Sequence, residues 1–112
     1  MDTEKLAEGM KALSSEARIG ILVLLRERPL CAGGIAHRLQ LSPSAASQHL
    51  RVLREAGLVQ DCRRGNHVHY SLIAGRLEEL SALLKDLTSG EVMTGCNRKK
   101  SACRKLNSEK GS

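Results

Sequence analysis

The sequence predicts a mainly α-helical fold with one small β-hairpin, and three observations support this prediction. Phe and Trp are absent from the 112 residues and Tyr70 is the single aromatic, so aliphatic side chains must supply the core. A β-sandwich core depends on aromatic and β-branched residues, so this composition favours helices. Several segments carry apolar residues at helical spacing, and one basic segment has the composition of a hairpin. A chain of this length forms one small core.

Two helices are expected at the amino-terminal end. Thr3 is a suitable N-cap for a helix over residues 4–13. Ser14 and Ser15 open a second helix, over residues 16–28, which the following proline ends. Apolar residues cover most of the circumference of this second helix, which predicts that it is central and buried.

A short helix over residues 32–39, a turn and a longer helix over residues 43–56 are expected next. Ser42 is a preferred N-cap, Pro43 fits the first helical position, and Gly57 fits the carboxyl-terminal cap. The longer helix has an apolar seam formed by Ala46, Leu50 and Leu53. A second, polar face carries Ser44, Ser47, Gln48 and Arg51. One face therefore packs, and the other is free to contact a partner.

A basic hairpin and a last helix follow. Residues 58–62 and 68–72 are strand-like on either side of the turn formers Gly65 and Asn66. Residues 75–88 carry a long leucine face, and Gly90 ends that helix. Residues 91–112 lack a core pattern and are expected to form a flexible, basic, cysteine-containing tail after a folded domain over residues 1–90.

The order of these elements predicts a winged helix-turn-helix. In that fold the second helix enters the major groove of DNA, where Gln48 and Arg51 offer donors and acceptors to base edges. Hairpin arginines reach phosphates or a minor groove. The alternative is a solvated helix face beside an ordinary charged turn. The candidate DNA contacts are Ser42, Ser44, Ser47, Gln48, His49, Arg51, Arg63, Arg64, Asn66 and His67.

The charge of the chain agrees with a nucleic-acid partner. The formal net charge is +6 and the isoelectric point is near 9.5. Residues 38–67 hold five basic and two acidic side chains, and residues 91–112 hold six and two. No nucleophile and base set or phosphate loop indicates an enzyme, and the scarcity of aromatics disfavours single-stranded nucleic acid. The polar, acidic amino terminus and the lack of a run of ~20 apolar residues predict a cytoplasmic protein without a membrane span.

Four cysteines are candidates for a reactive or metal-binding role. In a cytoplasmic chain Cys31, Cys62, Cys96 and Cys103 are expected to bind soft metals or to sense redox state rather than to form disulfides. On a continuous helix the last two would lie ~10 Å apart along the axis, too far to share one ion. The tail must therefore loop if they act together. The basic neighbours that favour their thiolates are Arg98, Lys99, Lys100 and Arg104.

Over about residues 6–89 the sequence resembles the ArsR-SmtB family of metalloregulatory repressors. The resemblance rests on LSSEARIGILVLL, on LSPSAASQHLRVLREAGLV and on CRRGNHVHYSL. It implies a homodimer paired through the first and last helices, an operator with inverted half-sites, and release of the DNA when an inducer binds. Apolar faces on the terminal helices, which a small chain cannot fully cover, independently favour a dimer.

The resemblance also narrows the range of possible inducers. The last helix of the zinc, cobalt and nickel sensors carries Asp and His ligands, whereas residues 74–89 contain no His. In the third-helix pattern of the arsenic and cadmium sensors, Cys31 matches the first cysteine and Gly33 replaces the second. Some arsenic sensors of the family use carboxyl-terminal cysteines, which implies a site at Cys96 and Cys103.

The expected inducer is therefore trivalent arsenic, as arsenite or an organoarsenical, or antimonite, with no permanent cofactor. Arsenite and antimonite prefer three thiolates, so the third would come from Cys62, Cys31 or the partner chain, whereas a monosubstituted arsenical needs only two. The alternative is a repressor that responds to persulfide or oxidant through Cys31 and Cys96.

Overall fold

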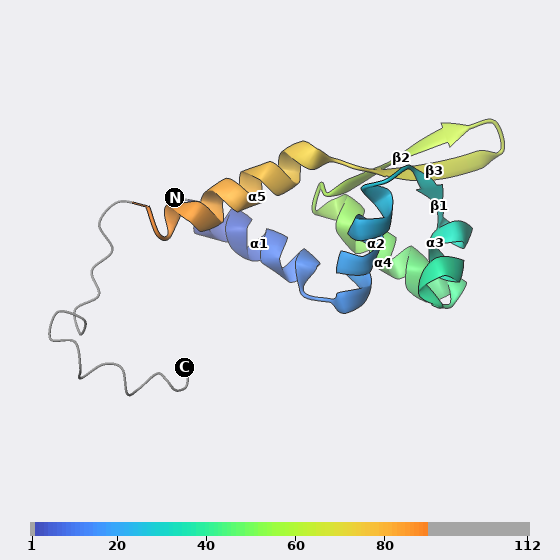
Figure 1. Ribbon diagram of the computed structural model, residues 1–112, viewed down its shortest axis with the longest axis horizontal. Helices are drawn as coiled ribbons and strands as arrows, with labels where there is room; N and C mark the ends of the chain where they lie inside the picture. Colours follow the sequence, from blue (N-terminus) through green and yellow to red (C-terminus); the bar gives the residue numbers. More distant parts are fainter. Residues whose placement is uncertain (1, 90–112) are drawn as a thin grey trace, which may run out of the picture.

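The computed structural model describes residues 2–89 and places five helices around a three-stranded antiparallel sheet, which confirms the predicted fold class (Figure 1). The predicted tail at residues 91–112, with Cys96 and Cys103, lies outside the described residues. The elements are α1 (Thr3–Leu13), α2 (Glu16–Leu25), β1 (Leu30–Cys31), α3 (Ala32–Leu39), α4 (Pro43–Glu55), β2 (Val59–Arg64), β3 (His67–Leu72) and α5 (Ala74–Asp86).

Helices α3 and α4 form the predicted helix-turn-helix. The turn between them depends on Gln40, which adopts a left-handed conformation with φ of 56°. The hydroxyl of Ser42 then accepts a hydrogen bond of 3.1 Å from the backbone N–H of Ala45, and Pro43 occupies the first helical turn. This N-cap satisfies one of the free amides at the start of α4 and fixes where the helix begins.

The sheet has the strand order β1-β3-β2, so the hairpin predicted from sequence is the larger part of a three-stranded sheet. Strand β1 was not expected, since two residues are too few to show any periodicity. The hairpin is tighter than predicted, because Arg64 pairs directly with His67 and leaves only Gly65 and Asn66 in the turn. Gly65 has φ of 62°, as the first central residue of a type II′ turn requires.

Aliphatic side chains alone fill the fully buried centre of the fold. The predicted seam of α4 is buried, with Ala46, Leu50 and Leu53 no more than 1% exposed. Leu50 and Leu53 pack in a cluster with the largest fully buried side chains of α2, α3 and β2, and with Leu58 just before β2. Burial of each Leu or Ile contributes about 1.5–3 kcal/mol, so this seam anchors α4 and leaves its opposite face to solvent.

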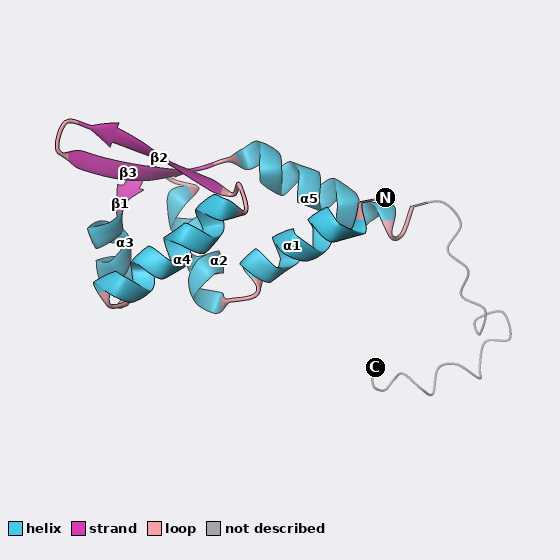
Figure 2. Cartoon of the chain, turned by 180° about the vertical axis from the view of Figure 1, so that it is seen from behind, coloured by secondary structure: helices cyan, strands magenta, loops and turns pink. Residues whose placement is uncertain are grey.

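Helices α1 and α5 lie side by side and run in opposite directions, at the end of the molecule away from the sheet (Figure 2). Gly9 is buried at their contact, where a Cβ atom would lie 2.4 Å from a methyl carbon of Leu80. The Lys5 Nζ atom donates to Glu79 Oε2 over 2.6 Å. Asp2 rather than Thr3 caps α1, because its carboxylate accepts from the backbone N–H of Lys5.

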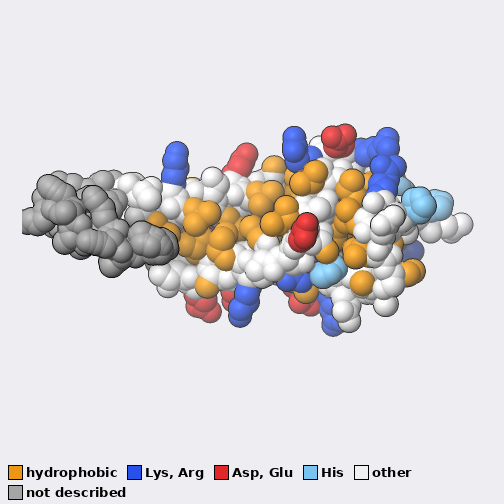
Figure 3. Space-filling model, turned by 60° about the horizontal axis from the view of Figure 1, so that its bottom comes forward, with side chains coloured by type: hydrophobic (Ala, Val, Ile, Leu, Met, Phe, Trp, Pro, Cys, Tyr) orange, Lys and Arg blue, Asp and Glu red, His pale blue; other side chains and the backbone are white. Residues whose placement is uncertain are grey.

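Two expectations about α2 are wrong. Helix α2 ends at Leu25 rather than residue 28, and a turn over residues 26–28 leads to Pro29, which disfavours the helical region at Arg28. It is also not buried all round, since Ile19 and Val23 are 49% and 50% exposed. On α5 the leucine face buries only Leu80 fully, while the last two leucines, Leu84 and Leu87, are 45% and 58% exposed. This agrees with the expectation that a small chain cannot fully cover its terminal helices. Hydrophobic side chains form a band along one face of the molecule (Figure 3).

Candidate nucleic-acid interface

The polar face of α4 is presented to solvent as the sequence predicts. Ser44, Ser47, Gln48 and Arg51 are all exposed, on the side of the helix away from its buried seam. Arg51 pairs with Glu55 at 3.5 Å, and their side chains are 70% and 66% exposed. An ion pair so open to water contributes little, so Arg51 remains available to another partner.

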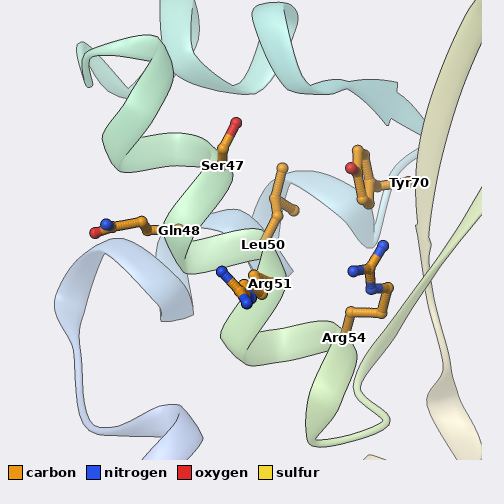
Figure 4. Close-up of a pocket in the computed structure, with 6 residues that line it drawn as sticks. All are labelled: Ser47, Gln48, Leu50, Arg51, Arg54 and Tyr70. Carbon is orange, nitrogen blue, oxygen red and sulfur yellow. The ribbon is translucent and has the colours of Figure 1, made fainter.

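A hollow of about 360 Å³ lies between α4 and the sheet. Figure 4 shows the side chains that line it, with Tyr70 contributed by β3 and the others by α4. The lining residues are Ser47, Gln48, Leu50, Arg51, Arg54 and Tyr70. Two arginines and an amide therefore border a concave surface next to the exposed polar face of α4, which we call the reading face. Arg54 and Tyr70 were not among the predicted contacts.

The wing, which is the hairpin of β2 and β3, carries its predicted residues at its exposed tip. Arg63, Arg64, Asn66 and His67 are all exposed. Because successive residues of a strand point to opposite faces, the two arginines project to opposite sides of the hairpin. The wing can therefore present a positive charge whichever of its faces meets a phosphate backbone.

An ion pair connects the wing to the reading helix, α4. Arg54 Nη1 of α4 lies 3.5 Å from Asp61 Oδ2 of β2, with both side chains less than half exposed. Asp61 faces the same side of the sheet as its cross-strand partner Tyr70. This pair is not predictable from residue spacing, because Arg54 and Asp61 are separated by the end of α4 and a turn, and such a segment has no regular geometry.

His49 occupies a different environment from the other predicted contacts. It is half-buried, and its Nδ1 lies 3.3 Å from Nη1 of Arg18 in α2. Arg18 also donates from Nε to the carbonyl oxygen of Ala12 over 2.7 Å. Arg18 thus links the end of α1 to the reading helix, a role that residue spacing does not reveal.

Cys31 and Cys62 are free thiols on neighbouring parts of the sheet. Both pair with His69, one from each side, so two strand spacings separate their Cα atoms. That separation is ~9–10 Å, well beyond the ~7 Å limit for a disulfide. Within residues 2–89 no three His, Cys, Asp or Glu side chains are already grouped to hold a metal ion.

Comparison with known proteins identifies the fold and the family. The family model described as "Bacterial regulatory protein, arsR family" matches residues 15–61. The transcriptional activator HlyU of Vibrio cholerae is 38% identical over 78 residues, which cover 70% of this chain and 72% of HlyU. The chain belongs to the arsR family of bacterial regulatory proteins.

Other arsR-family proteins extend this result. The arsenic resistance transcriptional regulator ArsR1 of Pseudomonas putida is 38% identical over 76 residues, which cover 67% of this chain and 59% of ArsR1. An ArsR-like regulator from Rhodococcus sp. RHA1 matches with a TM-score of 0.72 at 27% identity, covering 93% of each chain. The homodimeric winged helix-turn-helix DNA-binding domain of Mb0332 from Mycobacterium bovis has a TM-score of 0.65 at 28% identity, covering 77% and 80%.

Membership of the arsR family confirms two expectations. These proteins are DNA-binding transcriptional regulators, so the chain is not an enzyme. Its α3, α4 and hairpin are the helix-turn-helix and wing of that fold. Among residues 2–89 no helix has the length and apolar character to cross a membrane.

Proposed function

We propose that this arsR-family protein is a cytoplasmic repressor that binds operator DNA as a homodimer and releases it when trivalent arsenic binds its cysteine thiolates. The observation that carries the proposal is the exposed polar face of α4 beside a basic wing. The proposed DNA contacts are Ser42, Ser44, Ser47, Gln48, His49, Arg51, Arg63, Arg64, Asn66 and His67.

Contacts in the major groove come from α4 in this proposal. Gln48 and Arg51 hydrogen-bond base edges, and the short side chains of Ser44 and Ser47 let the helix approach closely. Arg63 and Arg64 on the wing bind phosphates or a minor groove, which positions the domain without reading sequence. His49 contributes through Nε2, because Arg18 already occupies its Nδ1.

Pairing of two chains is supported by uncovered apolar surface. Leu84 and Leu87 of α5 are exposed, and Leu6 and Met10 of the neighbouring α1 are only partly buried. We place the dimer contact on these first and last helices. Two reading helices related by a two-fold axis then meet inverted half-sites one turn of DNA apart, ~34–36 Å between centres. The homodimeric Mb0332 domain supports this assembly.

The proposed arsenic ligands are Cys96 and Cys103, with a third thiolate from Cys62 or Cys31. The similarity to ArsR1 of Pseudomonas putida supports arsenic as the inducer. Cys62 is the more accessible third ligand, because it is exposed. Cys31 is partly buried, and its Sγ accepts a hydrogen bond of 3.4 Å from the backbone N–H of Gly34 at the start of α3.

A titration of DNA release tests this proposal. A fluorescent operator bound to the protein is titrated with arsenite, antimonite, cadmium, zinc and polysulfide, with each cysteine replaced by serine in turn. Arsenite is expected to release the DNA, and Cys96→Ser or Cys103→Ser to abolish release while leaving the affinity for DNA unchanged. Undiminished release in both variants would overturn the tail site. Release by polysulfide that requires Cys31 and Cys96 would support the redox alternative instead.

A further inference from the structure

The hollow between α4 and the sheet is lined by side chains that can donate hydrogen bonds (Figure 4). Its polar lining residues are Ser47, Gln48, Arg51, Arg54 and Tyr70, and no carboxylate among residues 2–89 lines it. Two of them carry guanidinium groups, which stay positively charged throughout the physiological pH range and match the geometry of a phosphate group. The hollow is therefore suited to an anion.

Arg54 enters the hollow from the last turn of α4 and extends toward Tyr70 of β3 (Figure 4). Among residues 2–89 its guanidinium group has one partner, Asp61, whose Oδ2 lies 3.5 Å from Nη1. Both side chains are partly exposed, and an ion pair of this length in contact with water contributes little to stability. The other N–H groups of the guanidinium are therefore available to a second, stronger acceptor.

Tyr70 forms the opposite wall of the hollow. Its ring packs against the hydrophobic core, which fixes its position. It is the cross-strand partner of Asp61, so both side chains lie on the face of the sheet toward α4. The Tyr70 hydroxyl has no hydrogen-bond partner among residues 2–89, yet it is not one of the buried atoms that lack a partner, so it is in contact with solvent. In Figure 4 its oxygen points away from β3 toward α4, which provides a free donor beside Arg54.

The position of the hollow indicates which anion binds. In the proposed function, α4 lies in the major groove and the wing contacts the DNA beside it. Sugar-phosphate backbones border the groove, so one of them must pass between α4 and the wing, across the hollow. Arg54 follows Gln48 by six positions, which places it ~9 Å farther along the helix axis. The major groove is ~12 Å wide, so when Gln48 reaches base edges, Arg54 lies near the border of the groove, where the phosphates are.

We propose that a DNA backbone phosphate binds in this hollow, where it accepts hydrogen bonds from the guanidinium group of Arg54 and the hydroxyl group of Tyr70. The proposal rests on the proposed DNA-binding function and adds two contacts that the sequence did not predict. Charge-assisted bonds from arginine to phosphate are ~2.7–2.9 Å long, shorter and stronger than the 3.5 Å pair with Asp61. The phosphate therefore replaces Asp61 as the main partner of Arg54. The Asp61 carboxylate competes with the phosphate and weakens DNA binding.

Fluorescence anisotropy with a labelled DNA duplex of ~30 base pairs and arbitrary sequence tests this site. The operator sequence is not needed, because a phosphate contact does not depend on the bases. Arg54→Gln is expected to weaken binding about tenfold and to reduce the slope of log affinity against log salt by ~0.9 per bound chain. Arg54→Lys keeps the charge and should retain the slope. Tyr70→Phe keeps the packed ring and should weaken binding about tenfold without changing the slope, because no charge is lost.

A purely structural role for Arg54 predicts a different pattern. If Arg54 acted only through its ion pair, Arg54→Gln and Asp61→Asn would weaken binding alike and leave the slope unchanged, and that result would overturn the proposal. With a phosphate in the hollow, Asp61→Asn strengthens binding instead, because it removes the competing carboxylate. Lys85→Gln is the charge control. It removes a positive charge from the last turn of α5, away from the sheet, and should leave both affinity and slope unchanged.

Two further results contradict the phosphate site and are distinguishable from each other. If Arg54→Gln and Tyr70→Phe bind the duplex as tightly as the unchanged chain does, no phosphate is held in the hollow, although the chain still binds DNA. If the unchanged chain does not bind the duplex at low salt, the proposed DNA-binding function is itself wrong, and the phosphate site fails with it.

Discussion

Arg18 of α2 and His49 of α4 are joined by a contact of 3.3 Å between Nη1 and Nδ1. A guanidinium group only donates, so Nδ1 of His49 is the acceptor and its Nε2 carries the ring proton. Through Nε the same arginine donates to the carbonyl oxygen of Ala12 at the end of α1. One side chain thus fixes the reading helix relative to the two helices that precede the helix-turn-helix.

Arg18→Gln is expected to lower both stability and affinity for the operator. Hydrogen bonds from a charged donor each contribute about 1.5–3 kcal/mol, and Arg18 makes one to His49, one to the carbonyl oxygen of Ala12 and a longer one, of 3.4 Å, to that of Lys11. Urea unfolding should show a loss of that order. In a cycle with His49→Gln, the two changes should not be additive, since they remove one shared contact. Arg26→Gln alters an exposed arginine just after α2 and is the control. Equal unfolding midpoints for the two arginine variants would contradict the role assigned to Arg18.

Gln48 and Arg51 are expected to determine base preference, whereas Arg64 affects all sequences alike. Gln48→Ala or Arg51→Ala should cost ~1–3 kcal/mol at one base pair of the operator and little elsewhere. Arg64→Ala should weaken every sequence about equally and reduce the slope of affinity against salt by ~1. Affinities for a panel of single-base operator variants at several salt concentrations separate these outcomes. If the α4 variants weaken every sequence equally, Gln48 and Arg51 bind phosphates instead.

The contact between α1 and α5 is expected to weaken in acid. The hydrogen bond from Lys5 lowers the pKa of Glu79 below its ordinary value, with smaller contributions from the positive charges of Lys5 and Arg76. Its stabilising effect is therefore complete above the ordinary glutamate pKa of ~4.3 and is lost as the pH falls through the lowered value. At neutral pH the contact is intact.

Unfolding measured from neutral to acid pH checks this prediction. Glu79→Gln should reduce stability at neutral pH and flatten the part of its pH dependence that lies below about pH 5. Glu78→Gln is the matched control, because the neighbouring carboxylate is exposed and makes no ion pair with any residue from 2 to 89. If both variants follow the same pH curve, the Lys5 contact does not stabilise the fold.

Local signals in the sequence predicted the reading head, and long-range contacts account for what was missed. Ser42, Pro43 and the Ala46, Leu50 and Leu53 seam act within one helix, so their spacing alone located α4. Strand β1 exists only through its pairing with Tyr70 and His69, about forty residues away, and two residues carry no pattern of their own. The Arg18 contact with His49 spans 31 positions for the same reason.

The apolar surface of α2 illustrates a second limit of the sequence. Hydrophobic spacing shows which residues avoid water, but it does not distinguish the core of one chain from a contact between two chains. Ile19 and Val23 were therefore expected to be buried, yet they are half exposed in a single chain. Exposed apolar side chains of this kind lie on both α2 and α5, so each helix offers an apolar surface to a second copy.

Charged substitutions on the two helices distinguish which surface forms the dimer contact. Leu84→Lys with Leu87→Lys is expected to convert the dimer to a monomer, because each buried leucine contributes about 1.5–3 kcal/mol and a lysine cannot replace it. Both side chains are exposed in the single chain, so the fold itself should survive, as far-ultraviolet circular dichroism can verify. Operator affinity should fall as well, since a monomer presents one reading helix to two half-sites. Ile19→Lys with Val23→Lys should leave the dimer intact by analytical ultracentrifugation. A dimer that survives the α5 changes and dissociates with the α2 changes would move the interface to α2.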